Sequence, residues 1–452
     1  MRPYHVAIVG SGPSGFFAAA SLLKAADAAD ELEVAVDMLE MLPTPWGLVR
    51  SGVAPDHPKI KSISKQFEKT AADSRFRFFG NVVVGEHIEA AELAERYDAV
   101  IYAVGAQSDK PLNIPGEDLP GSISAVDFVG WYNAHPHFED KTPNLSGARA
   151  VVVGNGNVAI DVARILVTDP DVLALTDIAD HALESLRPCG VDEVVIIGRR
   201  GPLQTAFTTL ELRELGELEG VDVIVDPAQL ANITDEDAEA AGKTTKQNIK
   251  VLRGYAERAP RPNHRRIVFR FLTSPIEIKG EDQVESIVLG RNELVTDDSG
   301  WVSAKDTGER EELPVQLVVR SVGYRGVPTA GLPFDEKRGT IPNTDGRVDG
   351  SRNEYVVGWI KRGPTGVIGT NKKDSQDTVD TLLADLAKAT LSDFPADHAD
   401  RLADWLVERQ PKVVTSAHWE AIDQFERAAG EPHGRPRVKL PNLAKLLHVG
   451  HG

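Results

Sequence analysis

Short apolar runs alternate along the chain with longer segments of helical periodicity, which is typical of a parallel sheet flanked by helices. Runs of strand length occur at residues 5–9, 32–39, 97–106, 150–153, 193–198 and 316–323. An alanine-rich helix is predicted over Phe16–Ala26 and another over Ile160–Val167. The pattern predicts an α/β fold.

Three glycines follow the first apolar run, at Gly10, Gly12 and Gly15. Gly10 permits a tight turn, Gly12 lets the backbone approach a pyrophosphate, and Gly15 lets the helix pack closely on the strand. The next predicted strand ends at Glu40, whose carboxylate can accept hydrogen bonds from a ribose diol. A dinucleotide site is therefore predicted, with a purely structural βαβ unit as the alternative.

A second glycine turn, Gly154–Ala159, also joins an apolar run to a predicted helix. After an insertion at residues 168–191, its next strand ends in Arg199 and Arg200 instead of an acid. Two arginines can neutralise and bind the 2′-phosphate of NADPH, whereas an acid would favour NADH. We therefore predict NADPH specificity; solvated surface arginines are the alternative.

The strands predicted at 97–106 and 316–323 bracket the second glycine turn and both end near glycine. We predict two Rossmann-like dinucleotide-binding domains. The NADPH-binding domain, 108–323, is inserted into a discontinuous domain made of 1–107 and 324–452, whose last part is helical.

Composition narrows the possible classes of protein. A chain of 452 residues predicts two domains. Cys189 is the only cysteine, so an internal disulfide and a cysteine-ligated iron–sulfur cluster are excluded. Fifty Lys and Arg against 68 Asp and Glu give a net charge of −18, which disfavours binding to nucleic acid or to an anionic membrane.

The apolar runs bear on location as well. None reaches the length of a membrane-spanning helix. The chain passes from Met1 to the apolar run at Val6 without a charged segment followed by a separate apolar one, so a cytoplasmic location is expected.

Two longer segments, 41–59 and 358–371, occur together with the paired glycine turns and the arginine pair. In this combination the chain resembles the adrenodoxin reductase-type ferredoxin–NADP reductases, including their FprA-type bacterial members. The resemblance runs along nearly the whole chain. It implies that the discontinuous domain binds FAD and that no metal is bound.

The resemblance also implies cofactor contacts. The glycine turn and the resemblance together give the expected contacts with FAD: Gly10, Gly12, Ser14, Gly15, Glu40, Leu48, Val84, Trp359, Gly366, Val367 and Ile368. Those with NADPH fall on Lys110, Asn155, Gly156, Asn157, Val158, Arg199, Arg200 and Glu211. Lys110 departs from the arginine common at this place, keeping the charge but losing the planar fork.

The same resemblance places His57 and Glu214 near the junction of flavin and nicotinamide, as candidate catalytic residues. Each has a simpler interpretation. His57 lies in a proline-rich loop and can be structural, and Glu214 can face solvent on the helix predicted at 209–218.

The activity that the resemblance implies is hydride transfer from NADPH to FAD, followed by single-electron transfer to a ferredoxin. An NADPH-dependent quinone reductase or monooxygenase is the alternative enzyme, and a nucleotide-sensing binding protein is the non-enzymatic one. A glutamate synthase-type subunit would need cluster cysteines that this chain lacks.

Two further regions have less defined roles. The basic stretch 258–270 is either a solvated strand face or a docking patch for an acidic ferredoxin, centred on Arg261, Arg265 and Arg266. Residues 381–452 show helical periodicity, and we expect them to pack against the FAD domain without chemistry.

Overall fold

The computed structural model describes residues 2–29, 31–389 and 393–452. The chain forms two compact units. The split unit comprises Met1–Ser108, Asn133–Pro136 and Tyr324–Gly452, and the inserted unit comprises Asp109–Tyr132 and His137–Gly323. Residues 133–136 had been expected in the inserted domain, and the sequence gives no sign of their return. The short strands β5 (Ser108–Asp109) and β15 (Tyr324–Arg325) pair with each other where the chain passes between units.

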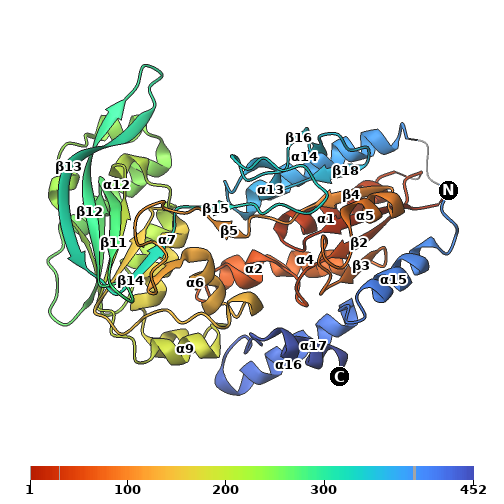
Figure 1. Cartoon of the computed structure of the whole chain (residues 1–452), viewed down its shortest axis with the longest axis horizontal. Coiled ribbons are helices and arrows are strands. Elements are labelled where there is room, and N and C mark those ends of the chain that lie inside the picture. Colours follow the sequence, from red (N-terminus) through yellow and green to blue (C-terminus); the bar gives the residue numbers. More distant parts are fainter. Residues whose placement is uncertain (1, 30, 390–392) are drawn as a thin grey trace. The chain divides into compact units, whose positions relative to one another are not determined.

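The split unit contains a seven-stranded sheet in the order β16-β17-β18-β4-β1-β2-β3 (Figure 1). Strands β1 to β4 and β18 run parallel, and β16 and β17 are antiparallel additions at one edge. The bounds are β1 Tyr4–Val9, β2 Val34–Leu39, β3 Phe76–Phe79, β4 Ala99–Tyr102, β16 Asn343–Thr344, β17 Arg347–Val348 and β18 Glu354–Val356.

The helices of this unit include members that pack on each face of the sheet. They are α1 Pro13–Asp27, α2 Leu48–Ser51, α3 Pro58–Lys61, α4 Ser64–Ala71, α5 Ala90–Arg96, α13 Trp359–Arg362, α14 Ile368–Leu386, α15 His398–Arg409, α16 Ser416–Gly430 and α17 Leu443–His451, with a 3-10 turn at Glu431–His433. Val6 and Ile8 of β1 point into a core shared with α1, α14, α16 and α17, whereas Ala7 and Val9 point into one shared with α5 and α15. This alternation follows from the strand's period of two.

The inserted unit contains a six-stranded parallel sheet in the order β6-β14-β7-β8-β10-β9. The bounds are β6 Ser122–Ser124, β7 Arg149–Val153, β8 Glu193–Gly198, β9 Val221–Val225, β10 Arg265–Phe271 and β14 Leu317–Arg320. Its helices are α6 Ala125–Tyr132, α7 Asn157–Val167, α8 Pro170–Leu173, α9 Asp180–Leu186, α10 Thr209–Leu215, α11 Asp235–Ala240 and α12 Lys243–Ala256, with 3-10 turns at Pro136–Phe138, Pro202–Gln204 and Pro227–Gln229.

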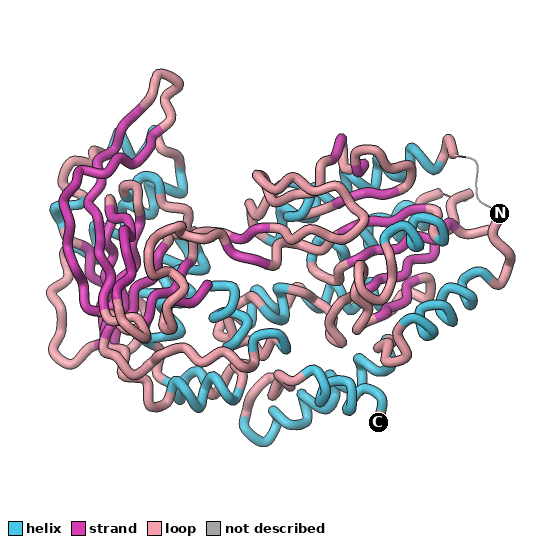
Figure 2. The backbone as a smooth tube through the Cα atoms, viewed as in Figure 1, coloured by secondary structure: helices cyan, strands magenta, loops and turns pink. Residues whose placement is uncertain are grey.

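A three-stranded antiparallel sheet covers one face of this parallel sheet. Its strands are β11 Thr273–Lys279, β12 Ser286–Thr296 and β13 Val302–Pro314. Ile278, Ile287 and Leu289 pack against Val151 of β7 and Val195 of β8 in one core. Strands β12 and β13 form a hairpin that extends beyond the rest of the sheet to a loop (Figure 2). The sequence analysis had not identified this hairpin.

The predicted α/β fold class is confirmed, and the differences concern element ends. The strand expected at 97–106 is shorter and spans Ala99–Tyr102, and the positive φ of Gly105, +71°, shows that the chain has left the extended conformation before residue 106. The helix expected at 209–218 ends at Leu215. Periodicity placed the last helical region from residue 381, but α14 begins at Ile368. Within the described residues, none of these helices combines the length and apolarity needed to cross a bilayer.

Candidate functional site

The first glycine turn is shaped by close backbone contacts in the split unit. Gly10 has φ +105°, and a Cβ there would lie 2.5 Å from the carbonyl oxygen of Ala103. A Cβ on Gly15 would lie 2.1 Å from the carbonyl oxygen of Gly10. A Cβ on Gly12, the N-cap of α1, would meet no atom within 4 Å. The turn therefore leaves open space at a helix N-terminus, where a pyrophosphate binds.

Glu40 follows β2 and lies beside this turn. Its carboxylate accepts hydrogen bonds from the amide (2.9 Å) and hydroxyl (2.5 Å) of Ser11 and from the amide of Leu42 (3.0 Å). Burial raises the pKa of Glu40, although these hydrogen bonds oppose the rise. The backbone carbonyl of Glu40 accepts from Val82, two residues before the predicted contact Val84. Glu40 therefore lies beside the glycine turn, and the contact predicted for Val84 stays a prediction.

The segment that carries Leu48 reaches the same turn. A Cβ on Gly47 would lie 2.8 Å from Cα of Gly12, so only glycine fits there. The amide of Trp46 donates to the carbonyl of Ser11 at 3.1 Å. Leu48, the first residue of α2, is thereby held next to the glycine turn.

The C-terminal segment approaches from the other end of the chain. Gly358 has φ +76°, and a Cβ there would lie 2.2 Å from Oγ of Ser14. Ser375 of α14 donates its hydroxyl to the carbonyl of Ser14 at 3.0 Å. Helices α1 and α14 pack side by side (Figure 1). Residues separated by more than 340 positions thus surround the start of α1.

The residues expected at the flavin lie just after Gly358. Trp359 contacts the ring of Tyr324 with centroids 5.3 Å apart, and its buried Nε1 has no hydrogen-bond partner among the described residues. Gly366 has φ +81°, Val367 is the N-cap of α14 and Ile368 is its first residue. The lone indole donor, the open helix N-terminus and the space at Gly12 fit a bound dinucleotide such as FAD.

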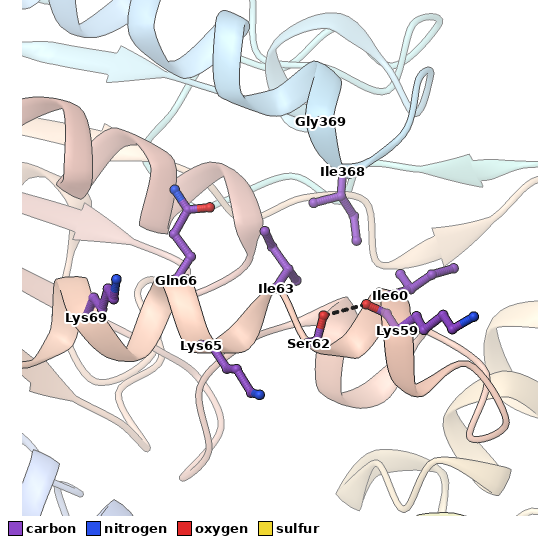
Figure 3. A pocket seen from close by; sticks show the side chains of 9 residues that line it. All are labelled: Lys59, Ile60, Ser62, Ile63, Lys65, Gln66, Lys69, Ile368 and Gly369. Atoms are coloured by element: carbon purple, nitrogen blue, oxygen red, sulfur yellow. Dashed lines mark hydrogen bonds between the residues drawn. The ribbon is translucent and has the colours of Figure 1, made fainter.

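A groove of about 760 Å³ lies between α3, α4 and the start of α14 (Figure 3). Its lining combines three isoleucines and three lysines, Ile60, Ile63, Ile368, Lys59, Lys65 and Lys69. The three lysines are exposed and have no ion-pair partner among the residues that the structure describes. This groove is a cationic surface with an apolar lining beside the expected flavin site.

Helix α2 is held by polar contacts with α16 and with the segment that follows it. Arg50 forms two hydrogen bonds with Glu426 of α16, at 2.6 and 2.9 Å. Arg437 lies 3.2 Å from the same carboxylate, and Lys439 donates to the carbonyl of Arg50 at 3.0 Å. Burial would raise the pKa of Glu426, but the two arginines outweigh it and lower that pKa. No local sequence signal pairs residues so far apart, and these contacts were not predicted.

The second glycine turn, in the inserted unit, repeats the geometry of the first. Gly154 has φ +139°, and a Cβ there would lie 2.1 Å from the carbonyl oxygen of Ser321. Gly156 is the N-cap of α7, and its surroundings are open within 4 Å of a Cβ. Asn157 and Val158 begin α7, and Asn157 accepts a hydrogen bond from the amide of Thr208 at 2.8 Å. This turn offers a second pyrophosphate site.

Arg199 and Arg200 directly follow β8. Arg199 is exposed and Arg200 is half-buried. Across the described ranges, neither has an ion-pair partner. Asn155, in the second glycine turn, lies close to Gly198, since a Cβ added to Gly198 would be 3.1 Å from Nδ2 of Asn155. The arginines and the second glycine turn therefore share one edge of the parallel sheet.

The remaining predicted residues occupy different settings. Glu211 is buried on α10 with Nη1 of Arg164 3.6 Å from its carboxylate, and Arg164 also binds Asp161 at 2.8 Å. Lys110 is exposed, and its amide donates to the carbonyl of Gly323 at 3.2 Å. Glu211 thus has an ion-pair partner within its own unit, and its contact with NADPH stays a prediction.

The two candidate catalytic residues belong to different units. His57 is the half-buried N-cap of α3 in the split unit. Glu214 is half-buried on α10 in the inserted unit and does not simply face solvent. Their catalytic roles stay predictions.

The basic stretch 258–270 is only partly paired with acidic side chains. Arg261 binds Asp222 at 2.7 Å, and Arg270 binds Glu311 at 2.8 Å. Arg265 donates to a main-chain carbonyl at the end of α7 at 3.2 Å. Acidic groups distant in sequence therefore pair with two arginines of the stretch, whereas Arg266 is exposed and has no ion-pair partner among the described residues, so a docking patch here stays an untested prediction.

Comparison with known proteins agrees with this geometry. Residues 4–253 match the family model described as pyridine nucleotide-disulphide oxidoreductase. The chain is 81% identical to NADPH-ferredoxin reductase FprA of Mycobacterium leprae over the full length of both. It is 41% identical to the mitochondrial NADPH:adrenodoxin oxidoreductase of Salvelinus fontinalis, over 98% of this chain and 90% of that protein.

A solved structure of a relative extends the match to three dimensions. The structure of Mycobacterium tuberculosis FprA in complex with NADPH is 79% identical, covers 100% of both chains and has a TM-score of 0.99. The chain belongs to the pyridine nucleotide-disulphide oxidoreductase family and, within it, to the adrenodoxin reductase-type ferredoxin–NADP reductases.

Proposed function

We propose that this protein is an FAD-containing reductase that oxidises NADPH and passes electrons to a ferredoxin. The observation that carries the proposal is the pair of glycine turns, each with open space at a helix N-terminus, in a chain 81% identical over its full length to an NADPH-ferredoxin reductase. When bound, FAD supplies a carrier that accepts a hydride and releases electrons one at a time.

The split unit would hold FAD with groups from both ends of the chain. Amides at the start of α1, beside Gly12, would bind the pyrophosphate, and Glu40 would face the ribose. The unpartnered Nε1 of Trp359 and the amides at the start of α14 would contact the flavin. A positive helix end at this point favours negative charge on the ring.

The inserted unit would hold NADPH. Amides at the start of α7 would bind its pyrophosphate, and the two unpaired arginines would bind its 2′-phosphate. In this proposal His57 and Glu214 position the nicotinamide and manage protons, while the hydride itself passes directly between the cofactors.

The lysine-lined groove is our candidate for the ferredoxin-binding surface. Ferredoxins of this class are acidic, and a chain of net charge −18 needs a local positive surface to attract one. Lys59, Lys65 and Lys69 supply three unpaired charges beside the expected flavin site. Charge reversal of all three should slow ferredoxin-dependent cytochrome reduction and remove its salt dependence.

Arg266, on the basic stretch that is the alternative docking surface, provides the matched control. R266E should leave ferredoxin-dependent transfer unchanged, and ferricyanide reduction should be unaffected in both variants. Slower transfer in R266E with normal transfer in the triple-lysine variant would return the docking site to the inserted unit.

The activity itself is tested by mixing the holoprotein with NADPH without oxygen and following flavin absorbance. A nucleotide sensor would leave the absorbance unchanged. A quinone reductase or monooxygenase would bleach it but transfer electrons to its own acceptor faster than to any host ferredoxin. A cytoplasmic location also remains a proposal, tested by cell fractionation.

A further inference from the structure

The β12–β13 hairpin contacts the three residues that follow β8, Arg199, Arg200 and Gly201, each at one point. At its base, Asn292 is 5% exposed and donates from Nδ2 to the carbonyl of Arg199 at 2.9 Å. Further along, Leu294 lies beside Gly201, where a Cβ would be 3.4 Å from its Cδ1. At the tip, the Trp301 ring lies over Arg200, with Cζ 5.8 Å from the ring centroid.

Trp301 is more exposed to solvent than tryptophan usually is. Its side chain is 64% exposed, although tryptophan is commonly well buried. Its main chain closes the hairpin loop through two hydrogen bonds with Asp297, at 3.0 Å each. These bonds fix the main chain of Trp301, whose exposed indole lies next to an arginine that has no ion-pair partner within the described chain.

We propose that Trp301 is a specificity-determining residue for NADPH, which rests on the function proposed above. The indole face attracts the guanidinium of Arg200 and so limits the positions that it samples before a ligand binds. A guanidinium ordered before binding loses less entropy when it grips the 2′-phosphate. The indole is a positioning group that acts through Arg200.

The ligand that isolates this effect is 2′,5′-ADP, which has the 2′-phosphate but no nicotinamide. A cation–π contact at an exposed site corresponds to about a two- to fivefold change in affinity, and lost ordering adds to it. W301A should therefore bind 2′,5′-ADP about three- to tenfold more weakly, measured calorimetrically on the holoprotein. Binding of 5′-AMP, which has no 2′-phosphate, should change less than twofold.

Two variants separate stacking from general disruption. W301F keeps an aromatic face, so it should retain affinity within about twofold while losing any tryptophan fluorescence change on ligand addition. F425A removes another exposed aromatic side chain, 49% exposed on α16, and should leave 2′,5′-ADP binding unchanged.

Coupling to Arg200 gives the decisive measurement. In the R200A background, W301A should cause no further loss of 2′,5′-ADP affinity, because the group it positions is gone. Full additivity of the two substitutions, unchanged binding by W301A, or equal weakening of 5′-AMP would overturn the assignment. If the wild-type protein itself does not prefer 2′,5′-ADP to 5′-AMP, the NADPH proposal fails instead.

Discussion

The buried pair Arg50–Glu426 allows a quantitative prediction about the split unit. The Arg50 side chain is 6% exposed and that of Glu426 is 0% exposed. Glu426→Gln keeps the shape but removes the charge that compensates Arg50, and breaking one partner of a buried pair costs about 3–5 kcal/mol. Because Arg437 retains Asp423 at 2.6 Å, only one arginine loses its main partner. We expect E426Q to lower the free energy of unfolding by about 3 kcal/mol.

The substitution should also weaken FAD binding, because Arg50 lies two residues after Leu48, a predicted FAD contact, in α2. Urea unfolding of the holoprotein, followed by flavin fluorescence, measures the loss of stability and the release of FAD together. E420Q, at an exposed position on the same helix, is the matched control and should cost less than about 0.5 kcal/mol. Replacing both partners by apolar residues, R50M with E426L, should recover most of the loss.

The pH dependence follows from the direction of the pKa shift. The pKa of Glu426 is lower in the folded protein, so its stabilisation is fully present above the unfolded pKa of about 4.3. That stabilisation disappears as pH falls through the folded pKa. The difference between wild type and E426Q should therefore be constant from about pH 6 to 8 and shrink below about pH 4. Equal stability of E426Q and E420Q at neutral pH would refute this reasoning.

Three further predictions concern the cofactor turns and the cysteine. R199A or R200A should raise the NADPH Michaelis constant roughly ten- to a hundredfold, because a hydrogen bond to a charged group contributes about 1.5–3 kcal/mol, while NADH kinetics stay nearly constant. G15A should yield protein with little FAD, since the added Cβ would lie 2.1 Å from the Gly10 carbonyl; the absorbance ratio of flavin to protein measures this. Burial raises the pKa of Cys189, so a thiol reagent should label the native protein more slowly at pH 8.5 than the unfolded protein, as mass spectrometry can follow.

Local chemistry made the nucleotide turns predictable. Gly10, Gly15 and Gly154 each stand where a Cβ would meet a main-chain oxygen within 2.5 Å, so the sequence must show glycine at these places. The end of β8 before Arg199 was likewise correctly placed, since an uninterrupted apolar run marks a buried strand.

Contacts between segments far apart in the chain could not be predicted from the local sequence pattern. The basic stretch looked like a free positive surface, because nothing near Arg261 in sequence shows that Asp222 neutralises it. Arg50 and Glu426 are 376 positions apart, and each alone reads as a surface charge. Trp301 lies in a polar hairpin with no periodicity, so its position over Arg200 is visible only in three dimensions.

The parallel pairing of β4 with β18 sets an order for folding during synthesis. The first four strands of the split unit are complete by residue 102, but their neighbour β18 ends at residue 356. The ribosome must add 356 − 102 = 254 residues in between, which takes roughly 13–50 s at about 5–20 residues per second. The inserted unit is finished first, so the nascent chain carries an incomplete, apolar sheet edge that makes it a natural client for chaperones.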